Sequence, residues 1–285
     1  MSVRAASLFL GFALFAAAQT TPGPVLVITA SARDCIMGAG GTLANMAQEG
    51  RAIYVAVMTN EEKSSVGKVP ADTRIANNNE SEAALKLLGV REVINLGHKA
   101  GELGYISSSE LRNQVMTLTR LYKPEIMFFP DWYTHYLNDL DIWYTGHMAE
   151  ESPYGGGSLF LQEMTYLGHP GTAARQYYFF SPYRPYRSGE GGEGNATMKQ
   201  VDVSSAMDKK MTALGMLKTS NGAWAEELRK RSGRTFQDEN FVSAFAKEMA
   251  ETIGSKHGMR FAEEFNHLRP VPGLPAHVLE HAKKK

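Results

Sequence analysis

Short apolar runs alternate with helical patterns along the first half of the chain. Four runs bounded by polar or turn-forming residues predict strands, and apolar positions spaced three or four apart predict helices between them. The predicted strands cover residues 25–30, 53–59, 92–96 and 125–129, and the predicted helices cover 41–49, 80–88 and 111–122. Because parallel neighbours need a crossover, this alternation predicts an α/β Rossmann-like sandwich with a mostly parallel sheet and helices on both faces.

The second half has a less regular pattern. It predicts strands at 176–181 and 200–203, separated by a mobile loop at 183–194 that is rich in Pro, Gly and Ser. Helices are predicted at 205–217, 223–230 and 239–253. We expect the last histidines to lie on the surface: His169, His257, His267, His277 and His281.

The N-terminal residues have the pattern of an export signal. Arg4 precedes an apolar run at 5–15 and small residues at 16–18. We therefore expect a signal peptide at 1–18, a single α/β domain at 19–285, and an exported protein that is periplasmic or extracellular. The apolar run is too short to span a bilayer, which needs about 20 such residues.

Composition narrows the range of partners. The 285 residues include 30 basic and 30 acidic side chains, so the formal net charge is zero. This balance removes the electrostatic argument for nucleic acid. A small, neutral or weakly charged molecule remains compatible. Cys35 is the only cysteine, so an intramolecular disulfide cannot form.

Ligands of open parallel sheets bind beyond the carboxyl ends of the strands. The segment that follows the first predicted strand, residues 31–43, contains Gly38, Gly40 and Gly41 before a helix. A dinucleotide fingerprint would need a third glycine where Leu43 stands. A nucleotide site with Glu61 after the second strand is therefore a minor alternative. The other interpretation of these glycines is close packing of helix on strand.

The segment 38–43, Gly-Ala-Gly-Gly-Thr-Leu, resembles the signature of the LmbE/PIG-L family of zinc-dependent N-acetylglucosaminyl deacetylases. In that signature His-Pro-Asp-Asp-Glu precedes Gly-x-Gly-Gly-Thr-Leu. Further similarity covers 80–90, 95–103, 131–152, 201–214 and 261–265, which is nearly the whole mature chain.

The acidic core of the signature is largely replaced. The resemblance implies that the three zinc ligands map to Ser31, Asp34 and Ile142, so one ligand type remains. The general base maps to Arg33, whose guanidinium cannot accept a proton from water. The histidine that stabilises the oxyanion maps to Asp139, and Ala100 stands at another Asp position. Zinc binding at this geometry should therefore be lost.

We expect the pocket to include Ser31, Arg33, Asp34, Ala100, Ile142 and His135. Without a metal, clustered acids need another positive charge, so we hypothesise that Arg33 pairs with Asp34, Asp141 or both. The leading interpretation is a catalytically impaired protein that keeps a sugar- or metabolite-binding crevice.

The alternative is an active deacetylase of N-acetylated amino sugars, with rewired zinc ligands and Asp139 or Asp141 as base. The further metal-capable residues for that alternative are Cys35, His98, His135 and His147.

Overall fold

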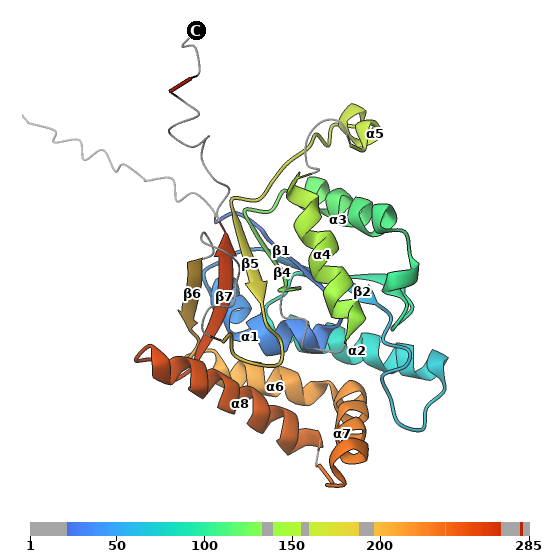
Figure 1. The fold of residues 1–285 in the computed structure, drawn as a ribbon, viewed down its shortest axis with the longest axis vertical. Coiled ribbons are helices and arrows are strands. Elements are labelled where there is room, and N and C mark those ends of the chain that lie inside the picture. Colours follow the sequence, from blue (N-terminus) through green and yellow to red (C-terminus); the bar gives the residue numbers. More distant parts are fainter. Residues whose placement is uncertain are drawn as a thin grey trace, which may run out of the picture.

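The computed structural model describes residues 22–132, 139–154, 160–187, 197–236, 238–268 and 280–281. One seven-stranded sheet organises them, with strand order β3-β2-β1-β4-β5-β7-β6 (Figure 1). The strands are β1 (Val25–Thr29), β2 (Ile53–Thr59), β3 (Glu92–His98), β4 (Ile126–Pro130), β5 (Gln176–Phe180), β6 (Thr197–Asp202) and β7 (Ala262–Leu268). The first five strands in this order, β3, β2, β1, β4 and β5, are parallel. Strand β7 is antiparallel to β5, and β6 is antiparallel to β7. The predicted mostly parallel sheet is confirmed.

Helices cover both faces of the sheet. They are α1 (Ala32–Gln48), α2 (Pro70–Leu88), α3 (Ser108–Tyr122), α4 (Leu140–Tyr154), α5 (Gln162–Tyr166), α6 (Met207–Met216), α7 (Lys218–Ser232) and α8 (Asp238–Lys256), with a 3-10 turn at Leu103–Tyr105. Figure 1 shows α3 and α4 on one face, and α1, α2, α6 and α8 on the other. The predicted sandwich is therefore confirmed.

Strand β1 is an inner strand of the sheet, between β2 and β4, and contributes side chains to two apolar cores. All five of its residues are buried, as expected of a parallel strand covered on both faces. Val25 and Val27 belong to the core under α1, and Leu26 and Ile28 to the core under α3 and α4. This arrangement fixes the end of β1, from which the candidate site begins.

The segment after β1 differs from the predicted loop. Helix α1 begins at Ala32, nine residues before the predicted start, because Ser31 and Asp34 form a capping box. Ser31 Oγ accepts from the amide of Asp34 (3.3 Å), and Asp34 Oδ2 accepts from the amide of Ser31 (3.1 Å).

The glycines therefore lie inside α1 and provide no loop of free amides. A Cβ on Gly38 would lie 2.5 Å from the Phe180 ring, and one on Gly41 would lie 2.6 Å from Val203. Close packing explains the glycines, and the structure contradicts a phosphate loop at this position.

A buried ion pair connects α1, α6 and β7. Lys210 Nζ lies 2.8 Å from Glu263 Oε1, and both side chains are almost fully buried. Lys210 also donates to the carbonyl of Met37, while Glu263 accepts from the amides of Gly41 and Thr42. These contacts attach the antiparallel part of the sheet to the helix that carries Asp34.

Two sequence expectations require correction in this part of the chain. His267 is buried in β7, where its Nε2 lies 3.2 Å from Gln176 Oε1, so the prediction of a surface position was wrong. Residues 183–187 of the predicted mobile loop are anchored, because the Tyr186 hydroxyl contacts Asp131 and its amide donates to Glu264.

The predicted signal peptide, residues 1–18, lies outside the described residues, so it stays a prediction. Among the helices that the structure describes, none is both long and apolar enough to cross a membrane.

Candidate active site

The site lies at the carboxyl ends of β1, β2 and β3, where a pocket of about 240 Å³ opens. Six sequence-predicted or motif positions meet there, together with residues that follow β2. The lining includes Ser31, Arg33, Asp34, Glu61, Lys63, Ala100, Asp139 and Asp141. Ile142 is buried in α4 and does not line the pocket, and His135 lies outside the described residues.

Asp34 is held by two neighbours at the start of α1. Its Oδ2 accepts from the Ser31 amide, and its Oδ1 accepts from the Tyr183 hydroxyl. Burial raises the pKa of Asp34 to about 6, although nearby Arg33 opposes this shift. The one retained zinc-ligand position is therefore a carboxyl whose two oxygens are already hydrogen-bonded.

Arg33 does not pair directly with an acid. Its Nε donates to the Tyr183 hydroxyl (3.0 Å) and its Nη1 donates to the carbonyl of Ser220 (2.8 Å). The guanidinium also lies 5.1 Å from the centre of the Trp224 ring. In the described residues, no ion pair joins Arg33 to Asp34 or Asp141. The hydrogen-bonded link to Asp34 runs through Tyr183 instead, and the guanidinium opposes the rise that burial causes in the pKa of Asp34, so Arg33 supplies positive charge to Asp34 without a direct contact.

Arg33 makes no direct contact with these acids because its side chain extends from α1 toward α7. There it contacts the Trp224 ring and the carbonyl oxygen of Ser220. Tyr183 then connects the two charges through one hydroxyl, which accepts from Arg33 and donates to Asp34. Burial alone would lower the pKa of Arg33, but Tyr183 and Asp34 raise it, so the guanidinium stays charged.

Asp139 and Asp141 act on the backbone around the pocket. Asp139 Oδ1 accepts from the amides of Asp141 (3.0 Å) and Ile142 (3.4 Å), as an N-cap of α4 does. The carboxylate of Asp141 accepts from the amides of Gly101 and Leu103 and holds the turn that follows β3. Burial raises the pKa of Asp141, and these amides oppose that shift.

Glu61 is the pocket residue that sequence reasoning underestimated. It appeared there only as an acid of the minor nucleotide alternative. It is 6% exposed, and its φ of 47° lies in the left-handed region, which is uncommon for a non-glycine residue. Burial raises its pKa to about 7, with Arg33 opposing the shift. Its place directly beyond β2 was the available sequence signal.

Of the other metal-capable residues, the three that the structure describes do not line the pocket. Cys35 is buried in α1, His98 Nε2 lies 2.7 Å from Gln114 Oε1, and His147 packs against Trp132 and Trp143. Among the described residues, no three His, Cys, Asp or Glu side chains are arranged to hold a metal.

The residues at the family's zinc positions do not fit that ion. Zinc needs about three protein ligands with nitrogen, sulfur or oxygen lone pairs and one open position. Ser31 is the N-cap of α1 and Ile142 offers no lone pair, so Asp34 is the one good zinc ligand among the three positions. Arg33 cannot serve as a general base.

Comparison with known proteins agrees with this geometry at the level of fold and family. Residues 26–141 match the family model described as PIG-L: GlcNAc-PI de-N-acetylase. The resemblance to the LmbE/PIG-L family is confirmed. The matched region spans β1 to the start of α4 and includes Ser31, Arg33, Asp34, Ala100 and Asp139.

Relatives of this LmbE/PIG-L-like chain include named deacetylases. It is 22% identical to the diacetylchitobiose deacetylase of Thermococcus kodakarensis over 257 residues, covering 89% of this chain and 85% of the relative. The N,N'-diacetylchitobiose deacetylase of Pyrococcus horikoshii has a TM-score of 0.70 at 22% identity, with 86% and 84% of the two chains covered.

One similar structure has a different activity in its name. The 4-carboxy-2-hydroxymuconate hydratase GalB of Pseudomonas putida has a TM-score of 0.65 at 18% identity, covering 89% of this chain and 99% of that chain. These similarities establish the shared fold. Because a fold hosts different reactions, the residues of the site must decide the chemistry.

Proposed function

We propose that this LmbE/PIG-L-like protein binds a small polar molecule in the Asp34 pocket and does not catalyse zinc-dependent deacetylation. The observation that carries the proposal is the chain of contacts from Arg33 through Tyr183 to Asp34. These contacts involve both Arg33, at the family's general-base position, and Asp34, at the one retained zinc-ligand position. Arg33 thereby supplies positive charge to an acidic pocket without accepting protons.

The charges that line the pocket favour an amino sugar or a related polyhydroxylated molecule. Four carboxyl groups, those of Asp34, Glu61, Asp139 and Asp141, face two cationic side chains. Arg33 bonds to Tyr183 and Ser220, and Lys63 pairs with Glu102 at 3.0 Å. An ammonium group would be attracted by the acids, and sugar hydroxyls would donate to carboxylate oxygens.

Metal analysis combined with ligand titration tests the proposal. The purified protein should contain zinc well below one equivalent and release no acetate from N,N'-diacetylchitobiose, with the Thermococcus kodakarensis relative as positive control. Glucosamine should bind more tightly than N-acetylglucosamine or glucose, and Asp34→Asn should weaken that binding. Stoichiometric zinc that is removed by a chelator together with acetate release would refute the non-catalytic assignment.

Restoring the family residues tests the assignment of positions. Combining Ser31→His, Arg33→Asp and Ile142→His should create zinc affinity, and adding Tyr183→Phe should increase it by freeing Asp34 Oδ1. Zinc analysis after dialysis measures both effects. If neither combination retains zinc, the assigned ligand positions are misplaced.

A specific observation favours a second candidate, a hydrolase or hydratase that uses Glu61. A carboxyl with a pKa of about 7 is suited to proton transfer near neutral pH. Asp139 and Asp141, the bases of the earlier alternative, are instead engaged with backbone amides. Turnover that disappears in Glu61→Gln and persists after chelation would support this candidate.

We also propose that the protein is exported through residues 1–18. Expression of the full chain with N-terminal sequencing of the secreted product tests this proposal. A product that retains Met1 inside the cell would contradict it.

A further inference from the structure

A second cavity lies at the opposite edge of the sheet, by the amino ends of β4 and β5. Its volume is about 480 Å³, within the range of roughly 300–1,000 Å³ that is typical of small-molecule sites. The C-terminal half of α1 contributes Thr42, and Glu49 is the C-cap of that helix; Ile126 and Gln176 begin the adjacent strands. Asp34 and Arg33 lie at the other end of α1, so this cavity is separate from the pocket described above.

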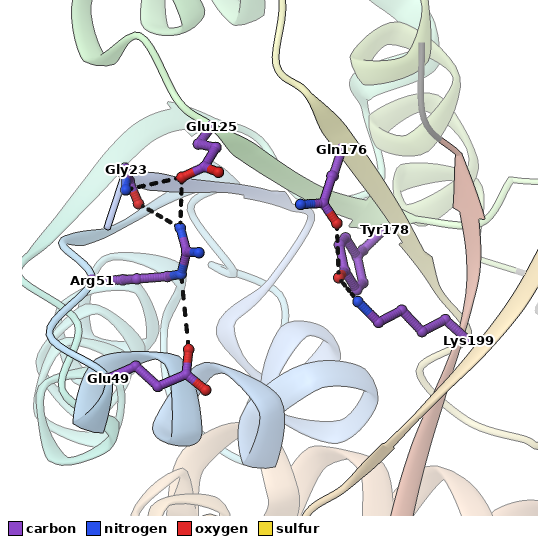
Figure 2. Close-up of polar contacts among 7 residues, drawn as sticks. All are labelled: Gly23, Glu49, Arg51, Glu125, Gln176, Tyr178 and Lys199. Carbon is purple, nitrogen blue, oxygen red and sulfur yellow. Dashed lines mark hydrogen bonds and ion pairs between the residues drawn. The ribbon is translucent and has the colours of Figure 1, made fainter. Parts of the chain in front are cut away.

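Two cationic side chains approach the cavity from opposite sides (Figure 2). Arg51 Nη1 bonds to the Gly23 carbonyl and to Glu125, each at 2.9 Å, and its Nε lies 3.9 Å from Glu49. Figure 2 shows the remaining guanidinium nitrogen directed toward the side where Gln176 lies. Arg51 is therefore fixed in place while one of its nitrogens stays available.

Lys199 lacks a comparable acidic partner. Its Nζ donates to the Tyr178 hydroxyl and lies 4.7 Å from the centre of the Tyr178 ring. The part of the chain that the structure describes contains no ion pair between Lys199 and a carboxylate. Tyr178 in turn donates to Gln176 Oε1 at 3.3 Å, which orients the Gln176 amide nitrogen toward the cavity, as Figure 2 shows.

Thr42 contributes a buried hydroxyl to the wall of the cavity. It lines the cavity and is 1% exposed, yet its hydroxyl has no hydrogen-bond partner among the described residues. A buried hydroxyl without a partner costs free energy, so native proteins rarely leave one unpaired. Because the hydroxyl oxygen is enclosed, a ligand oxygen in the cavity would pair with it only after a rotation of the Thr42 side chain.

We propose that this cavity is a binding site for a small hydroxylated carboxylate. Lys199 makes no ion pair among the described residues, so its positive charge can match a carboxylate, whereas Arg51 is balanced by Glu125 and Glu49. Asp202 also lines the cavity, but one of its carboxylate oxygens accepts from the amide of Ser204. The nearby carboxylate of Glu49 would repel a dianion and accept a ligand hydroxyl. The amide nitrogen of Gln176 and the hydroxyl of Thr42 supply neutral hydrogen bonds.

Isothermal titration with gluconate, glucose and inorganic phosphate tests the proposal. Gluconate should bind saturably and more tightly than either glucose or phosphate. Lys199→Gln should weaken gluconate binding about tenfold or more, as loss of a charge-assisted hydrogen bond does. Lys199→Arg should retain most of it, and Lys256→Gln, which changes an exposed lysine outside the cavity, should leave it unchanged.

Thr42→Val provides a second variant in case the Lys199 variants fold poorly. The substitution removes an unpartnered hydroxyl, so thermal stability without ligand should not fall, while gluconate affinity should decrease. Absence of saturable gluconate binding, equal affinity for glucose, tighter binding of phosphate, or full affinity in both Lys199→Gln and Thr42→Val would each overturn the assignment.

Discussion

The hydroxyl of Tyr183 joins Asp34 to Arg33, two residues adjacent in the sequence whose side chains point to different neighbours. It donates to the carboxylate and accepts from the guanidinium. A charged pair is thereby connected across a hydroxyl, at the positions where the LmbE/PIG-L signature has two aspartates.

Tyr183→Phe should reduce the free energy of unfolding by about 1–2 kcal/mol, because the hydroxyl's hydrogen bonds to Arg33 and to Asp34 are both lost. The pKa of Asp34 should rise above about 6, since the donated hydrogen bond favours its charged form. Urea unfolding and carboxyl NMR titration measure these effects. Tyr166→Phe, at an 86% exposed tyrosine, is the matched control and should change neither quantity.

Stability should fall as the pH rises from about 4 to 7. Burial raises the folded-state pKa values of Asp34 and Glu61 to about 6 and about 7, above the usual values near 4. The folded protein therefore binds protons more tightly than the unfolded chain does. The resulting stability is fully present below about pH 4 and is lost as the pH passes through these folded-state pKa values.

Glu61→Gln should remove about 1–3 kcal/mol of this decline, which thermal unfolding at several pH values measures. Glu102→Gln is a useful contrast, because a hydrogen bond from Lys63 lowers the pKa of Glu102. The stability that Glu102 contributes is therefore lost as the pH falls, not as it rises. An unchanged pH profile in Glu61→Gln would show that this carboxyl does not titrate in the range.

Lys210→Met should destabilise the protein by about 3–5 kcal/mol, because it leaves the carboxylate of Glu263 buried without its cation. Adding Glu263→Gln should recover part of the loss. Lys86→Met, which breaks an exposed pair with Glu82, should cost less than about 1 kcal/mol. Urea unfolding of the single and double variants supplies the comparison, and additive losses for Lys210 and Glu263 would contradict the pairing.

Two glycine substitutions should have opposite signs. Gly41→Ala should cost about 1–3 kcal/mol, because the added Cβ would lie 2.6 Å from Val203. Gly215→Ala, inside α6 with nothing within 4 Å of the added Cβ, should raise stability by up to about 1 kcal/mol. Thermal unfolding decides both, and equal effects would mean that the packing at α1 is looser than described.

The parallel half of the sheet could be predicted because its strands are apolar and bounded by turns. Strand β7 could not be predicted by that rule. Its segment Ala262–Leu268 contains Glu263, Glu264, Asn266 and His267, all of them buried. Lys210, the amide of Tyr186 and Gln176 compensate three of these side chains, and each compensating group comes from a distant part of the sequence.

Ser31, Asp34 and Ala100 could be placed because they follow strand ends, and Asp139 and Asp141 through the resemblance to the family. All five residues line one pocket. Tyr183 was missed because it lies 149 residues from Asp34, in a segment whose composition indicated a mobile loop. The direction of Arg33 was missed because it depends on α7, whose first residues precede the predicted helix.

The contacts of Glu263 make helix α1 dependent on a strand that lies more than 200 residues later in the sequence. Two amides in the middle of that helix depend on a carboxylate delivered by the last described strand. Shortening the protein before β7 would therefore remove more than an outer strand: it would leave Lys210 and the backbone beside Gly41 without their acceptor. Strand β7 and the helix that bears Asp34 are in this sense one folding unit.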